Sequence, residues 1–136
     1  MSAPGETTIA SVVGDIGDTP YTVEIAAGHH RLLADEPKGL GGGDTGPSPF
    51  GYVLSGLAAC SAITLRMYCE RKEWPPVGVH VGLTLRIVAG QREIERVVRF
   101  GEGLDEVQVK RLAEVVEKTP VTLALKAGMT INTTIK

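Results

Sequence analysis

The sequence predicts one α+β domain in which antiparallel strands pack against a long buried helix. Residues 77–87 place apolar side chains at every second position, which is typical of a half-buried strand. Residues 50–65 are apolar or small on every face of a helix, which predicts burial on all sides. A chain of 136 residues suits one domain and is too short for two ordinary ones.

The composition excludes several classes of function. Hydrophobic residues make up 43% of the chain and charged residues 22%, as in ordinary globular proteins. The net charge of −2 and the aromatic content of 4% argue against nucleic-acid binding, which needs a clustered positive field or stacking platforms. Residues 1–8 carry neither a basic segment nor an apolar run, so we expect no secretory signal and a cytoplasmic protein.

Strands are expected first, over residues 6–34. Residues 6–13 favour β-structure, and residues 21–25 alternate apolar and polar side chains. A turn at residues 26–28 then leads to a third strand over residues 29–34.

A loop over residues 35–48, rich in Gly and Pro, precedes a central helix predicted over residues 49–72. Ser48 suits the capping position and Pro49 the first helical position. Gly, Ser and Thr within an apolar stretch of under ~20 residues argue against a membrane span, so we expect no membrane partner. Burial of the whole helix in so small a chain predicts that a second subunit covers one face, which makes a homodimer.

Two further strands are expected over residues 77–100, joined by a turn at residues 89–91. The second of them carries Ile94, Val98 and Phe100 on one face. Both strands therefore offer an apolar face to the core.

Two helices are predicted over residues 105–127. Asp105 and Gln108 have the spacing of a capping box at the start of the first helix. Thr119, followed by proline, suits the cap of the second helix. A last strand is expected over residues 129–135.

The two cysteines are too few for a disulfide framework or a Cys-rich zinc site. Cys60 lies among alanines in the central helix, where it is either a small packing residue or a reactive thiol. A reactive thiol needs a cation or donors to hold the thiolate. Cys69 lies nine residues further on, ~13–14 Å along the axis and on the opposite face, so an intact helix excludes a disulfide between the two.

The loop contains a formal G-x-G-x-x-G over residues 41–46. Pro47 and Pro49 remove N–H donors from the place where a pyrophosphate would bind, and no βαβ pattern surrounds the motif. We therefore expect no nucleotide or other cofactor. We also expect no metal, because His29 and His30 are adjacent on a strand and point to opposite faces.

Three segments, taken together and in this order, carry a family resemblance. They are HRLLADEP (residues 30–37) with GGDTGPSP (42–49), the helix LAACSAITLRMY (57–68) and VEKTPV (116–121). The combination resembles the OsmC/Ohr superfamily of thiol peroxidases.

The resemblance implies an OsmC-like fold, in which an intertwined α+β homodimer packs two central helices together and forms active sites at the subunit interface. It further implies that Cys60 attacks the distal oxygen of a hydroperoxide, which leaves a sulfenic acid and an alcohol. An arginine steadies the attacking thiolate in the family, and Arg31 is the candidate here because no other arginine precedes Cys60. Apolar side chains that would favour organic hydroperoxides are expected to line the substrate site: Phe50, Tyr52, Val53 and Leu57.

Two positions depart from the family pattern. Thr119 stands where many members carry a second, resolving cysteine, and Phe50-Gly51 stands where such members place a glutamate. We therefore expect a one-cysteine hydroperoxide reductase in oxidative-stress defence, with an external thiol as reductant. The alternative is an OsmC-like homodimer without turnover that binds an apolar small molecule in the interface groove, with Cys60 as a packing residue.

Overall fold

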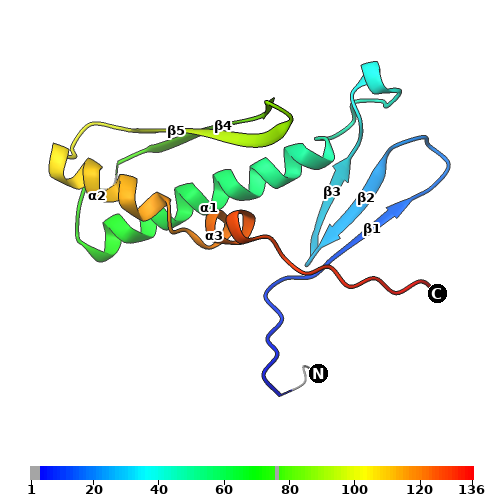
Figure 1. Ribbon diagram of the computed structural model, residues 1–136, viewed down its shortest axis with the longest axis horizontal. Helices are drawn as coiled ribbons and strands as arrows, with labels where there is room; N and C mark the ends of the chain where they lie inside the picture. The colour runs from blue at the N-terminus through cyan, green and yellow to red at the C-terminus, as the bar shows by residue number, and fades with distance from the viewer. Residues whose placement is uncertain (1–3, 76) are drawn as a thin grey trace. The chain divides into compact units, whose positions relative to one another are not determined.

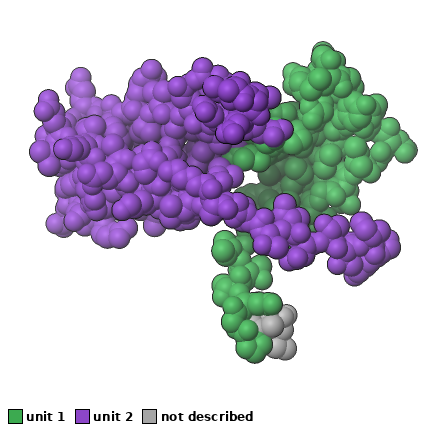
Figure 2. All heavy atoms as spheres, in the orientation of Figure 1, with its two compact units in different colours: residues 1–53 green, residues 54–136 purple. Residues whose placement is uncertain are grey.

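The computed structural model describes residues 4–75 and 77–136 (Figure 1). It confirms the α+β class, with antiparallel sheets and one long helix. The chain divides into two compact units, residues 1–53 and residues 54–136 (Figure 2). The single domain over residues 1–136 stays a prediction.

The first unit contains a three-stranded antiparallel sheet of β1 (Val12–Ile16), β2 (Val23–Ala27) and β3 (His30–Ala34), in that order. The strand predicted over residues 6–13 is wrong in its position, because β1 begins only at Val12, which pairs with Ala27 at the end of the short β2. The turn between β2 and β3 is Gly28-His29 rather than residues 26–28, and Gly28 takes a φ of 60° there.

The long helix α1 (Pro49–Arg71) follows a loop that contains the short 3-10 helix η1 (Lys38–Leu40). The prediction for this helix was residues 49–72. Ser48 caps α1 as expected, since its Oγ accepts the backbone N–H of Gly51 at 3.1 Å. By length and composition alone α1 is apolar enough to cross a membrane, a test that the core helix of a soluble protein also passes.

The second unit joins most of α1 to a β-hairpin and two short helices. The hairpin pairs β4 (Val79–Val88) with β5 (Gln91–Phe100) through the two-residue turn Ala89-Gly90. Both turn residues have positive φ, at 50° and 81°, as a type I′ turn requires. The helices are α2 (Glu106–Val116) and α3 (Pro120–Ala127), and α2 begins with the predicted capping box.

The core of this unit lies where α1, α2 and the hairpin meet, around Leu65, Cys69 and Leu112. Buried side chains recur at every fourth position of α1 and form one stripe. Other apolar side chains of the helix, including Ile63 and Met67, are exposed in the single chain. The expected burial on every face is therefore not met within one copy of the chain.

The strand predicted over residues 129–135 is wrong. These residues have no regular secondary structure, and in the described part of the chain neither sheet includes them. Their alternating pattern favours a strand, but a strand forms only where a neighbour accepts and donates its backbone hydrogen bonds.

Candidate functional site

The two cysteines occupy different environments on α1. Cys60 is half-buried, and its Sγ lies 4.0 Å from Thr64 Oγ1. Cys69 is buried in the core, and this burial raises the pKa of its thiol. A buried thiol with a raised pKa stays protonated at neutral pH and is a poor nucleophile. Cys60 is the more accessible of the two.

The other predicted site residues lie mainly in the first unit. Arg31 is exposed on β3, at a hollow of about 300 Å³. Phe50, Tyr52 and Val53 belong to the first turns of α1, and the Tyr52 hydroxyl donates to the carbonyl of Leu33. Their roles, and that of Arg31 toward Cys60, stay predictions.

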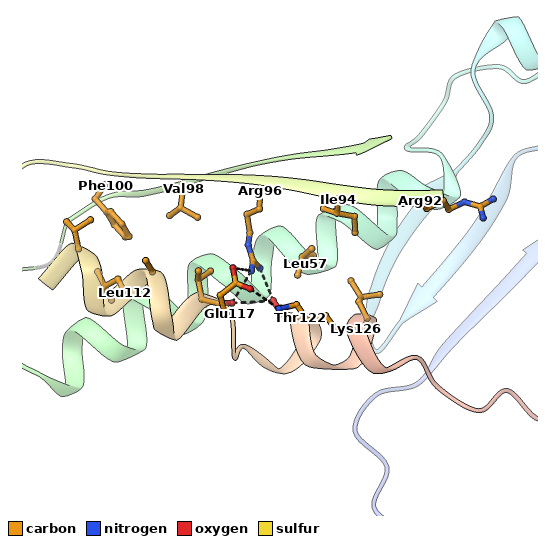
Figure 3. A pocket seen from close by; sticks show the side chains of 14 residues that line it. Leu57, Arg92, Ile94, Arg96, Val98, Phe100, Leu112, Glu117, Thr122 and Lys126 are labelled. Carbon is orange, nitrogen blue, oxygen red and sulfur yellow. Dashed lines mark hydrogen bonds and ion pairs between the residues drawn. The ribbon is translucent and has the colours of Figure 1, made fainter. Parts of the chain in front are cut away.

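Leu57, the remaining predicted substrate residue, lines a cavity inside the second unit. The cavity has a volume of about 620 Å³ and opens between α1, β5, α2 and α3 (Figure 3). Its walls are mostly apolar, with four charged side chains among them. The lining residues are Leu57, Arg92, Ile94, Arg96, Val98, Phe100, Val109, Leu112, Ala113, Val116, Glu117, Thr122, Leu125 and Lys126.

Arg96 reaches from β5 toward α1 and the corner between α2 and α3 (Figure 3). Its side chain is only 11% exposed. Nη1 donates to Ser61 Oγ at 3.0 Å and to Thr122 Oγ1 at 2.8 Å, and Nη2 donates to the carbonyl of Val116 at 3.2 Å. One guanidinium thus joins three helices, because its planar fork offers donors in several directions.

Thr119 is fully buried next to this cluster. Its backbone caps α3, since its carbonyl accepts the N–H of Leu123, but its hydroxyl makes no cap hydrogen bond. Thr119 is therefore the N-cap of α3, as predicted, although its side chain makes no capping hydrogen bond. The hydroxyl lies instead 2.6 Å from Thr122 Oγ1 and 3.3 Å from the carbonyl of Val116, which gives this buried polar group its partners.

Glu117 connects the cluster to solvent. Its carboxylate lies 3.5 Å from Arg96 Nη2 and accepts a hydrogen bond from Lys126 Nζ at 2.8 Å. The hydrogen bond from Lys126, helped by the charges of Lys126 and Arg96, holds the pKa of Glu117 below its ordinary value against the opposing effect of burial. Glu117 is therefore ionised at neutral pH.

Arg96 was not predicted from the sequence, although its position in the alternating pattern of β5 indicates a buried charge. On β5 it has the same parity as Ile94, Val98 and Phe100, so it projects from the apolar face of the strand. A charged side chain on the apolar face of a strand is either paired or functional, because an unpaired buried charge is costly.

A second polar cluster surrounds Asp35 in the first unit. The buried Asp35 carboxylate accepts five hydrogen bonds, from Thr22, the Glu36 and Gly43 N–H groups, and both the N–H and the hydroxyl of Thr45. These bonds, that from the Thr45 hydroxyl above all, lower the pKa of Asp35 to about 2. Among the described residues, no three His, Cys, Asp or Glu side chains gather as metal ligands.

The fold and the cysteine pair define a class: an α+β protein with a half-exposed thiol halfway along a long apolar helix. A family model described as "OsmC-like protein" matches residues 41–134, well over half of the chain. The chain belongs to the OsmC-like family. No curated protein sequence matches it.

Solved structures of the same fold come from several bacteria. An OsmC-like protein from Mycoplasma pneumoniae has a TM-score of 0.76 at 17% identity, over 89% of both chains. A putative osmotic stress induced and detoxification response protein from Psychrobacter arcticus has a TM-score of 0.70 at 18% identity, over 88% of both chains. The organic hydroperoxide resistance protein OhrB of Bacillus subtilis has a TM-score of 0.60 at 20% identity, over 88% of this chain and 91% of its own. At these identities the likeness shows the fold.

Proposed function

We propose that this protein reduces organic hydroperoxides in peroxide defence, with Cys60 as the nucleophile. The observation that carries the proposal is the contrast between the two thiols: Cys60 is half-exposed on α1, within the segment that matches the family, whereas Cys69 is buried with a raised pKa. The names of related structures, organic hydroperoxide resistance proteins among them, support this class of substrate.

The proposed reaction has two stages. The Cys60 thiolate attacks the distal oxygen of the hydroperoxide; an S–O bond forms, the O–O bond breaks, and the leaving alkoxide takes a proton to become an alcohol. A thiol then attacks the sulfenic sulfur and releases water, and a second thiol frees Cys60 as the first leaves in a disulfide. Arg31 is the proposed cation that steadies the thiolate.

The reductant must come from outside the chain, because the sequence has only one other cysteine. Cys69 lies nine residues along the same helix, ~13–14 Å away in axial rise, and is buried in the core. This arrangement supports a one-cysteine enzyme that uses an external thiol.

The test measures loss of cumene hydroperoxide in the presence of dithiothreitol. Cys60→Ser abolishes turnover, whereas the matched Cys69→Ser retains most of it. Mass spectrometry after mild peroxide treatment and trapping with dimedone places the adduct on Cys60 at doses that leave Cys69 unmodified. Equal turnover in the Cys60→Ser variant overturns the proposal.

The alternative is a family member without turnover that binds an apolar small molecule, and the apolar cavity of about 620 Å³ favours it. In that case neither cysteine variant changes peroxide loss, and no adduct forms at Cys60.

The active protein is proposed to be a cytoplasmic homodimer. The exposed apolar side chains of α1, such as Ile63 and Met67, and those of the C-terminal segment, such as Ile131 and Ile135, support a second copy as partner. Light scattering on the purified chain gives twice the monomer mass if this is right and the monomer mass if it is wrong.

A further inference from the structure

The cavity of the second unit combines an apolar interior with an excess of positive charge. Arg92, Arg96 and Lys126 line it, against one acid, Glu117. Ile94, Val98 and Leu112 are among its apolar walls (Figure 3). A site with this composition fits a ligand that has one anionic group and an apolar body.

Arg96 is the cation best placed to receive the anion. Its nearly buried guanidinium is held in place by Ser61, Thr122 and the Val116 carbonyl, so binding costs little side-chain entropy. Those three acceptors are neutral. Among the described residues, the acid that pairs with Arg96 is Glu117, whose side chain is 56% exposed.

The contact between Arg96 and Glu117 is loose. At 3.5 Å it exceeds the usual length of a charge-assisted hydrogen bond, about 2.7–2.9 Å. Glu117 is 56% exposed and holds Lys126 at 2.8 Å instead. A ligand carboxylate can therefore displace Glu117 from Arg96 while Glu117 keeps its partner Lys126.

We propose that this cavity binds a small organic carboxylate, with the carboxylate on Arg96 and its hydrocarbon chain along Val98 and Leu112. Glu117 acts as the displaceable counter-ion. The inference does not depend on a reaction at Cys60, and its test uses no peroxide.

Isothermal titration calorimetry with decanoate, and with decanol as the uncharged match, tests the proposal on the full chain. Decanoate binds at least about tenfold more tightly than decanol, because only the carboxylate reaches a buried cation. Equal affinities, or no heat from either ligand at millimolar concentration, overturn the proposal. The second result, together with a dimer mass, assigns the cavity to a second copy of the chain.

Two variants locate the anion. Arg96→Met removes the preference for decanoate, whereas Arg86→Met, on the opposite face of the same hairpin, keeps it. Glu117→Gln removes the competing carboxylate without touching the guanidinium, so decanoate binds about threefold more tightly and decanol is unchanged. Weaker decanoate binding by Glu117→Gln overturns the proposal that the ligand carboxylate displaces Glu117 from Arg96. This affinity can be measured even if Arg96→Met does not fold.

Discussion

The two polar clusters of this molecule bury opposite charges in different ways. Asp35 accepts hydrogen bonds from its own loop and from one neighbouring strand connection, and every donor lies within the first unit. Arg96 draws its acceptors from three helices and adds one long contact to an exposed acid. The carboxylate is enclosed by donors, whereas the guanidinium faces a cavity.

This difference separates a structural charge from a binding charge. A buried ion whose partners all come from its own loop and one neighbouring connection organises the backbone around it and has nothing left to offer a ligand. A buried ion with neutral, fixed acceptors and a distant counter-ion keeps an unmatched charge toward the cavity.

The Asp35 loop is expected not to tolerate an added methyl group at Gly46, where its backbone lies against that of Leu33. A Cβ at Gly46 would clash with the carbonyl oxygen of Leu33, so Gly46→Ala forces the backbone apart and lowers the free energy of unfolding by about 3 kcal/mol or more. Gly39→Ala, where a Cβ meets nothing within 4 Å, changes it by less than about 0.5 kcal/mol. Urea denaturation followed by circular dichroism measures both; equal losses would show that the loop is not closely packed.

Arg96→Met is expected to lower the free energy of unfolding by about 2 kcal/mol, because the Val116 carbonyl and the hydroxyls of Ser61 and Thr122 lose their donor. Arg86→Met on the neighbouring strand removes only an exposed ion pair with Glu95 and costs less than about 1 kcal/mol. The same denaturation experiment compares the two variants. A loss no greater for Arg96→Met than for the control would contradict a fixed guanidinium.

The lowered pKa of Asp35 predicts that part of the stability of the folded chain is lost in acid. The pKa of Asp35 is lowered to about 2 in the folded chain from an ordinary value of 3.8. Its stabilisation is therefore complete above the ordinary value and is lost as the pH falls from there through the folded pKa. Between those two pH values, the melting temperature of the wild type falls by several degrees relative to that of Asp35→Asn. The control Asp44→Asn behaves as the wild type. If the melting temperatures of all three proteins change with pH in parallel, Asp35 does not stabilise the fold in this way.

The features that were predicted correctly from the sequence depend on neighbours in the chain. The Ser48 cap and the Asp105–Gln108 capping box join residues three positions apart, so their spacing alone carries the information. Whether a segment such as β1 or residues 129–135 forms a strand, and where it begins, depends on a neighbouring strand that can pair with it, and the local pattern does not contain this information.

The candidate site divides in the same way. Cys60 was predicted as a site residue because a family motif surrounds it, and its role stays a prediction. Arg96 was missed because its acceptors come from residues up to 35 positions away. Thr119 was predicted to cap α3 because threonine before proline is typical of that position, and it does occupy it. Its hydroxyl turned inward because Thr122 and the Val116 carbonyl offered buried partners.

Glu117→Gln is expected to have the smallest effect on stability, less than about 0.5 kcal/mol, because the acid is 56% exposed and its ion pairs are screened by solvent. Glu114→Gln, which removes the exposed pair with Arg111, serves as the control and changes stability by a similar amount. By contrast, removing an essential counter-ion from a buried charge costs about 3–5 kcal/mol of stability. A loss of that size would make Glu117 a fixed partner of Arg96, like the donors around Asp35, and would leave the guanidinium no free charge for a ligand.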